Sequence, residues 1–162
     1  MNAKKLFNRI MIDGLGGMGL GLFGTLIIGT IIQQISALIG GSAGDILYQF
    51  GKMASAMTGA GIGVGVAYKF KESPLVVVSA ATAGMVGAFA GNIAKGTVFV
   101  DGAVVLSGPG EPLGAFIAAY VGTEVGHLIS GKTSVDILVT PLLSITVGSA
   151  VGLFAGPPIS AF

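Results

Sequence analysis

The sequence predicts an all-α membrane protein with about five transmembrane helices, and three observations support this fold class. From Gly14 to Gly44 the chain carries no charged residue, although a bilayer core requires only about 20 apolar residues in a helix. Hydrophobic residues make up 52% of the chain and charged residues 9%, whereas soluble domains contain about 25% charged residues. Glycine contributes 29 of the 162 residues, which in a membrane protein indicates closely packed helices.

The same composition excludes several other classes of protein. The net charge of +1 gives no reason to expect a nucleic-acid partner. Because the chain has no cysteine and one histidine, we expect no disulfide, no metal site, no cofactor and no catalytic residue of its own. Lys4, Lys5 and Arg9 precede an apolar run about twice as long as that of a signal peptide, so we interpret this run as a retained first span.

The five predicted spans follow the apolar segments and their prolines. The third and fourth spans each begin on a proline, which the first helical position tolerates. Gly156-Pro157-Pro158 should end the fifth span. In the second span glycines stand at positions 59, 61, 63 and 65, which weakens a helix, so a broken or mobile segment is one interpretation. The predicted spans are residues 12–39, 53–70, 74–94, 112–129 and 137–155.

A short β-hairpin is predicted between the third and fourth spans. Residues 97–106 place β-branched side chains on both sides of Asp101-Gly102, a sequence typical of a two-residue hairpin turn. An open two-stranded ribbon cannot face lipid, so we expect it outside the bilayer or covered by protein. Residues 107–112, rich in glycine and proline, should be irregular and should lie against protein or a wet cavity.

The basic residues predict the orientation of the chain in a cell membrane. With five spans and a cytoplasmic N-terminus, six basic residues lie inside and two, Lys52 and Lys95, lie outside, which agrees with the positive-inside rule. The hairpin is then extracellular, as is the C-terminus. The six inside residues are Lys4, Lys5, Arg9, Lys69, Lys71 and Lys132.

An odd number of spans suggests that residues 1–162 form a single transmembrane domain that is one half of a larger transporter. Duplicating such a unit inverts the second copy, and inverted repeats of this kind build many transporters. The chain stops on the apolar residues 159–162, which agrees with a missing second half. A truncated product and a half-unit that dimerises are the alternatives. Self-association is also expected from small-residue faces such as Gly148, Gly152 and Gly156.

Six residues are candidates for binding a polar solute: Asn92, Gly110, Glu111, Pro112, Glu124 and His127. Glu111 stands between Gly110 and Pro112 at the start of the fourth span, and a carboxylate there can accept hydrogen bonds from sugar hydroxyls. Amides could add contacts, and Asn92, Gln33 and Gln34 are available.

Two of these candidates lie inside the fourth span. Glu124 and His127 are three residues apart on one helix face, and ionisable residues within a span suggest function. The alternative interpretations are a carboxylate that stabilises a helix N-terminus for Glu111, and interfacial residues near the cytoplasmic end for Glu124 and His127.

Several of these features together resemble enzyme IIC, the membrane subunit of bacterial phosphotransferase systems. They are the glycine-rich spans, the hairpin-like stretch, the turn at residues 108–114 and Ala119-Tyr120-Val121-Gly122. The resemblance is to a compact branch of IIC-like proteins and covers about the N-terminal half of such a protein. It implies that the chain carries a sugar inward, that a separate IIB partner phosphorylates this sugar, and that Glu111 helps to hold it.

The sequence therefore favours a sugar-transport subunit that binds, orients and gates while a partner supplies the chemistry. One alternative is a solute-binding or sensing membrane protein that keeps the fold without transport. Another is a channel or structural oligomer built on glycine packing. Glu111 separates these classes, because a purely structural protein should tolerate Glu111→Gln.

Overall fold

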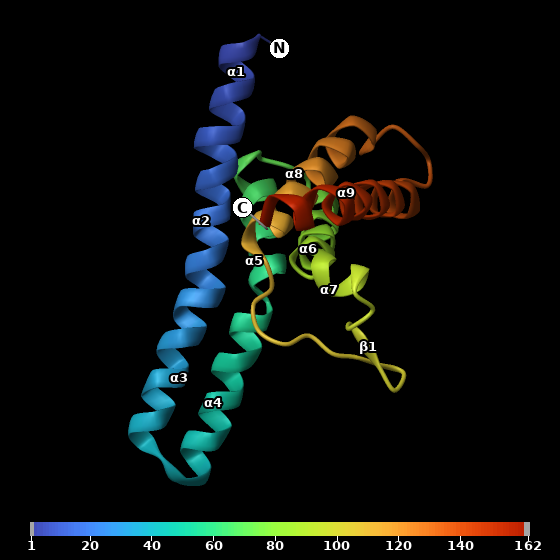
Figure 1. The fold of residues 1–162 in the computed structure, drawn as a ribbon. Helices are drawn as coiled ribbons and strands as arrows, with labels where there is room; N and C mark the ends of the chain where they lie inside the picture. Colours follow the sequence, from blue (N-terminus) through green and yellow to red (C-terminus); the bar gives the residue numbers. More distant parts are fainter. Residues whose placement is uncertain (1, 161–162) are drawn as a thin grey trace.

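The computed structural model describes residues 2–160, so the predicted apolar end at Ala161 and Phe162 lies outside the described residues. Within this part the chain is helical apart from loops and one small hairpin (Figure 1). The N-terminal half forms a long rod with an antiparallel neighbour, and the later helices gather on one side of it. The elements are α1 (Ala3–Asn8), η1 (Arg9–Gly14), α2 (Leu15–Leu22), η2 (Phe23–Ile27), α3 (Ile28–Ile39), α4 (Gly41–Ala56), α5 (Thr58–Lys69), α6 (Pro74–Ala88), α7 (Ala90–Ala94), β1 (Phe99–Val100), β2 (Ala103–Val104), α8 (Pro112–Ile129) and α9 (Asp136–Ser160).

The rod from α1 to α3 is one continuous helix of 37 residues that includes two π-helical turns, η1 and η2. The sequence predicted a start near Ile12, and this start is wrong, because the helix begins at Ala3. Asn2 caps it by accepting a hydrogen bond from the Lys5 N–H at 2.8 Å. Lys4, Lys5 and Arg9 are good helix formers, so leaving the apolar segment does not end the helix.

Helix α4 corrects the predicted start of the second span at Met53. The chain reverses at Gly40 and Gly41, both with positive φ, and α4 then runs back along α3 (Figure 1). A Cβ on Gly51 would lie 2.6 Å from the Gly29 carbonyl oxygen, so the two helices touch backbone to backbone. Residues 41–52 lie outside the predicted spans, but their small residues allow close packing that keeps the segment helical.

Helix α5 is unbroken from Thr58 to Lys69, so the interpretation that the glycines at positions 59–65 break the helix is wrong. The break lies one residue earlier, at Met57. The alternating glycines face two neighbours: Gly61 and Gly65 approach Gly21 and Gly17 of the rod, and Gly59 and Gly63 approach α6. A Cβ at Gly63 would overlap the Ala80 carbonyl oxygen. Contact on both faces therefore offsets the weak helix propensity of glycine.

The third predicted span is interrupted. Helix α6 ends at Ala88, Phe89 leaves the helical region, and the five residues of α7 follow. At this break the Ala88 carbonyl accepts a hydrogen bond from the Glu111 N–H at 2.7 Å. The N–H of a residue 23 positions later in the chain thus bonds to a carbonyl that would accept an intrahelical hydrogen bond in a continuous helix.

The predicted hairpin and fourth span are confirmed. Phe99 pairs with Val104 and Val100 with Ala103, and both turn residues, Asp101 and Gly102, have positive φ as the expected turn type requires. The hairpin projects away from the helices (Figure 1). Helix α8 spans Pro112–Ile129, with the bounds that the sequence predicted.

The predicted end of the fifth span is wrong, because α9 continues through Pro157 and Pro158 to Ser160. Both prolines lie in the last turn of α9, so few residues follow the backbone hydrogen bonds that they remove. The fixed φ of proline also lies in the helical range. Gly156 also lacks the Cβ that would otherwise clash with the ring of Pro157.

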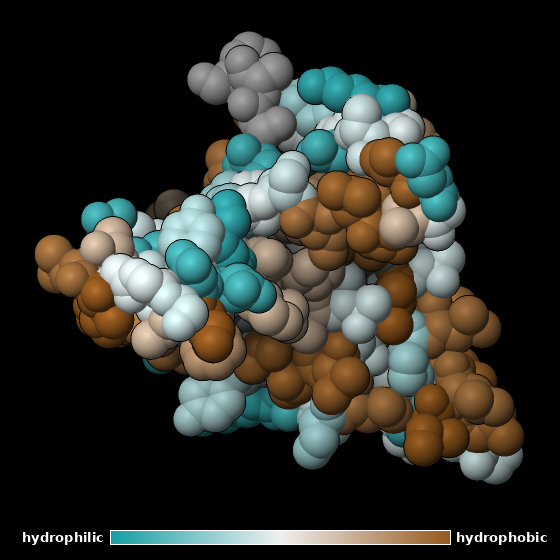
Figure 2. Space-filling model, turned by 90° about the horizontal axis from the view of Figure 1, so that it is seen from below, coloured by the Kyte–Doolittle hydropathy of each residue, from teal (hydrophilic) through white to brown (hydrophobic). Residues whose placement is uncertain are grey.

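Apolar side chains cover much of the surface, as expected for a protein in lipid (Figure 2). Among the described residues three helices are long and apolar enough to cross a membrane, at Ala3–Ile39, Pro112–Ile129 and Asp136–Ile159. Helix α6 is apolar but shorter. An all-α membrane protein agrees with this structure, and the number of five spans stays a prediction. The buried core lies between α5, α6 and α8 and includes Ile62, Val66 and Phe116.

Candidate functional site

A polar pocket lies where the broken helix α6–α7 meets the start of α8 and the end of α9. Its volume is about 220 Å³. Asn92 and Lys95 contribute from α7 and the residues after it, and Gly110 and Glu111 contribute from the turn before α8. The remaining lining residues are Gly87, Ala88, Ala90, Gly91, Gly156 and Pro157. The structure thus brings together three of the predicted candidates, Asn92, Gly110 and Glu111.

Glu111 has two roles in this pocket. As the N-cap of α8, its Oε1 accepts a hydrogen bond from the Leu113 N–H at 3.0 Å, which matches the alternative interpretation of a helix-stabilising carboxylate. The side chain also lines the cavity, so the cap leaves hydrogen-bonding capacity for a ligand. Pro112 occupies the first position of α8 and is absent from the pocket lining.

Gly110 determines the shape of the turn. Its φ is +76°, which favours glycine, and a Cβ at this position would lie 2.6 Å from the Ala88 carbonyl oxygen. The turn can therefore lie directly on the α6–α7 break only because residue 110 has no side chain. A Cβ at Gly91 would meet nothing within 4 Å, and this residue also lines the pocket.

Lys95 is a charged pocket residue that was not predicted from the sequence as a site residue. The sequence predicted only that it is one of two basic residues on the outside. Its position three residues after Asn92 is a signal that could have identified it, because residues three apart share a face of a helical turn. The residues that line the pocket therefore include one acid, one amide and one lysine.

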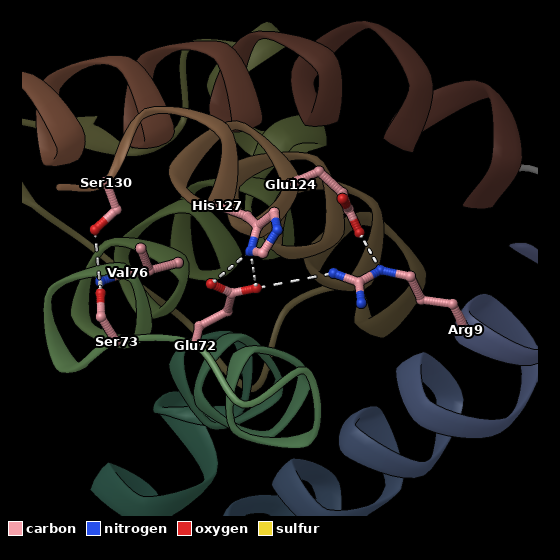
Figure 3. Close-up of polar contacts among 7 residues, drawn as sticks. All are labelled: Arg9, Glu72, Ser73, Val76, Glu124, His127 and Ser130. Carbon is pink, nitrogen blue, oxygen red and sulfur yellow. Dashed lines mark hydrogen bonds and ion pairs between the residues drawn. The ribbon is translucent and has the colours of Figure 1, made fainter. Parts of the chain in front are cut away.

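Glu124 and His127 lie elsewhere, in a second polar cluster (Figure 3). Glu124 is 13 residues after Glu111 in the same helix, which places it about 20 Å away along α8. The cluster, which we call the Arg9 cluster, consists of Arg9, Glu72, Glu124 and His127. It joins the N-terminal rod, the turn between α5 and α6, and the last turns of α8.

Arg9 is the centre of this cluster. Its Nε donates a hydrogen bond to Glu124 Oε1 at 2.6 Å, and its Nη2 lies 3.8 Å from Glu72 Oε1. The guanidinium also lies 3.9 Å from the centroid of the Phe70 ring, a cation–π arrangement. Sequence reasoning used Arg9 only for orientation. A charged Glu124 within an apolar helix could have suggested a cationic partner, but nothing local identifies a residue 115 positions away.

Glu72 is the most buried member of the Arg9 cluster, with 6% of its side chain exposed. His127 Nδ1 lies 2.9 Å from its Oε1 and 3.2 Å from its Oε2. A buried carboxylate requires such partners, because an unpaired charge away from water is strongly unfavourable. The Arg9 cluster therefore places a nitrogen of Arg9 or His127 beside each of its two carboxylates and ties three helical segments together. Within residues 2–160 no three His, Asp or Glu side chains lie close enough to hold a metal ion.

Gln33 lies in neither polar region. Its amide bonds to Ser55 Oγ at 3.1 Å and to the Gly29 carbonyl at 3.3 Å, so it links α3 to α4. The sequence analysis offered Gln33 as a contributor to the same site as Glu111. The structure does not place it there, because α3 packs against α4 and not against the α6–α7 break.

The comparison with protein families identifies the chain. The family model described as "Phosphotransferase system, EIIC" matches residues 12–162. No curated protein and no solved structure matches the chain. The match covers nearly all of the sequence, so the chain belongs to the enzyme IIC family of phosphotransferase systems, and the resemblance drawn from its sequence is confirmed. It is a multi-pass membrane protein and a transport subunit of such a system.

Proposed function

We propose that this enzyme IIC subunit binds a sugar in the pocket of Asn92, Lys95, Gly110 and Glu111 and carries it for phosphorylation by a separate IIB protein. The observation that carries the proposal is that Asn92, Lys95 and Glu111, whose side chains end in an amide, an ammonium group and a carboxylate, line one cavity at a helix break. Sugar hydroxyls both donate and accept hydrogen bonds, so they can satisfy all three groups. Broken helices at a binding site are a common feature of transporters.

The size of the cavity favours a small sugar. Pockets for drug-sized ligands measure about 300–1,000 Å³. A volume of about 220 Å³ is smaller than this range and suits a single sugar ring better than a disaccharide. One carboxylate and one ammonium group balance each other, which favours a neutral sugar over a charged one.

The chemistry of phosphorylation is assigned to the partner. The chain has no cysteine, and its one histidine, His127, bonds to Glu72 in the Arg9 cluster about 20 Å from the pocket. We further propose that the N-terminus is cytoplasmic, on the basis of the basic residues at positions 4, 5, 9, 69, 71 and 132.

Sugar binding to purified protein in mild detergent, with and without Glu111→Gln, tests this function. Glutamine keeps an acceptor oxygen but removes the charge, and a hydrogen bond to a charged group is about twice as strong as a neutral one, so the variant should bind the accepted sugar roughly threefold to tenfold more weakly. Isothermal titration with a panel of neutral monosaccharides measures this change and selects the sugar.

Asp101→Asn is the matched control, because it removes the same charge from the exposed hairpin turn, where asparagine also tolerates positive φ. Its sugar affinity should equal that of the wild type. Unchanged binding in Glu111→Gln would place the sugar elsewhere. If no sugar binds and Glu111→Gln leaves every solute phenotype intact, the structural alternative gains support.

A further inference from the structure

A second groove lies at the other end of α6 from the sugar pocket. Its volume is about 420 Å³. Tyr68 and Lys69 line it from the end of α5, Lys71 and Glu72 from the turn, and Val77 from the first turns of α6. We call it the Lys69–Lys71 groove.

The free charge in this groove is positive. Lys69 and Lys71 are both exposed, and within residues 2–160 neither has a carboxylate partner. Glu72 also lines the groove, but its carboxylate is 6% exposed and faces Arg9 and His127. The two ammonium groups are thus available to an anion, and the nearest acid is already paired.

Lys71 occupies a position that usually belongs to glycine. The Lys71 N–H bonds to the Tyr68 carbonyl at 2.9 Å and the Glu72 N–H to the Ala67 carbonyl at 3.1 Å, which is the Schellman pattern at a helix end. The φ of Lys71 is +58°, in the left-handed region that favours glycine. A lysine here is unfavourable for the backbone, and it sets an ammonium group beside that of Lys69.

Exposed apolar side chains lie on α5 and α6, the two helices that the groove joins. Val64 and Tyr68 lie one turn apart on the same face of α5 and are 42% and 66% exposed. Val78 on α6 is 66% exposed. An anion with an attached hydrocarbon chain fits this arrangement better than a free anion, because the lysines take the charge and the valines contact the chain.

The surrounding charges place the groove at the basic end of the molecule. Arg9 contacts Glu72 directly, and Lys4 and Lys5 lie one to two turns beyond Arg9 on the same helix. Ser73 lies beside Ser130, so the loop that carries Lys132 is also close (Figure 3). Clusters of basic residues next to membrane helices attract anionic lipid headgroups.

We propose that the Lys69–Lys71 groove binds the phosphodiester headgroup of an anionic phospholipid. The headgroup lies between the two ammonium groups, and one acyl chain runs along Val64, Tyr68 and Val78. This site is independent of the sugar pocket.

Thermal unfolding of delipidated protein in mild detergent, titrated with phosphatidylglycerol, phosphatidylcholine or inorganic phosphate, tests the proposal. Phosphatidylglycerol should raise the midpoint of the wild type, and phosphatidylcholine should not. In Lys69→Gln/Lys71→Gly the half-saturating concentration should rise roughly 25-fold, about fivefold for each lysine. Glycine at position 71 keeps the Schellman turn, so the lipid-free protein should unfold at the wild-type temperature or above it.

Lys4→Gln/Lys5→Gln is the matched control, because it removes the same charge from the same end of the molecule but outside the groove. Its half-saturating concentration should change by less than about twofold, since most of the attraction near the surface is local. An equal loss in both double variants would overturn the proposal in favour of general charge attraction. Stabilisation by inorganic phosphate at the same concentrations would overturn the proposal of a lipid ligand and indicate a site for free phosphate. No effect of phosphatidylglycerol on the wild type would also overturn it.

Discussion

Helix α8 carries a carboxylate near each end, and the two differ in what surrounds them. Glu124 is held by Arg9 at 2.6 Å, and the neighbouring Glu72 is buried between Arg9 and His127. The Glu111 side chain accepts one hydrogen bond, from the backbone of its own helix, and Glu111 lines a cavity of about 220 Å³. Charges that are satisfied by other side chains hold helices together, whereas a half-satisfied carboxylate beside a cavity can bind a ligand.

The contrast between the two ends of α8 also separates stability from binding. Substitutions in the Arg9 cluster should change the free energy of unfolding and leave the intrinsic affinity of the sugar pocket unchanged. Substitutions around Glu111 should change binding more than stability, except where they affect the backbone of the turn. The expected effects on stability decrease from Arg9→Met through Gly110→Ala to His127→Gln.

Arg9→Met should have the largest effect on stability. It leaves Glu72 and Glu124 without their cation, and breaking a buried pair costs about 3–5 kcal/mol. We expect a value at the lower end of this range, about 3 kcal/mol, because the Glu124 side chain is 30% exposed. The free energy of unfolding in mixed micelles titrated with a denaturing detergent measures this loss.

A double-variant cycle with Glu124→Gln shows whether the loss comes from the ion pair. In the Arg9→Met background, Glu124→Gln should restore part of the stability, because it removes one of the unpaired charges. If Arg9→Met unfolds like the wild type, the Arg9 cluster does not hold the rod, and the contrast between the two ends of α8 fails.

Gly110→Ala should destabilise the protein by about 2–3 kcal/mol and also weaken sugar binding. About 1–2 kcal/mol comes from placing an alanine at positive φ. The rest comes from the overlap of its Cβ with the Ala88 carbonyl, which lies 2.6 Å away. Unfolding and titration calorimetry on the same preparation measure the two effects.

Gly108→Ala provides the comparison for this substitution. Gly108 also has positive φ, at +77°, but a Cβ there meets nothing within 4 Å. It should show only the backbone cost and bind sugar like the wild type. Equal effects of the two substitutions would mean that the contact with Ala88 does not shape the pocket.

His127→Gln should have the smallest effect, no more than about 1 kcal/mol in stability. The His127 side chain is 59% exposed, and exposed partners of an ion pair contribute little. Glutamine keeps a donor for Glu72, whose main charged partner stays Arg9. A loss as large as that of Arg9→Met would show that His127, and not Arg9, is the essential partner of Glu72.

Local chemistry allowed some elements to be predicted from the sequence and misled in others. The hairpin follows from Asp101-Gly102, which suits a turn with two positive φ values, and the start of α8 follows from Pro112. Glycine was the main source of error. In α5 glycine suggested a break, whereas the glycines contact neighbouring backbones, and these contacts stabilise the helix but cannot be read from the sequence.

The sequence by itself determined the membrane class, the hairpin, the bounds of α8 and the selection of Glu111 as a polar residue at a helix start. Each of these depends on residues within a few positions of one another, or on total composition. Only the tertiary structure decided that α6 breaks at Ala88, where Glu111 takes the free carbonyl, that Lys95 and Glu111 line one pocket, and that Arg9 pairs with Glu124. These pairings join residues 16 to 115 positions apart, and charge or hydropathy along the chain carries no information about which distant partner a group will find.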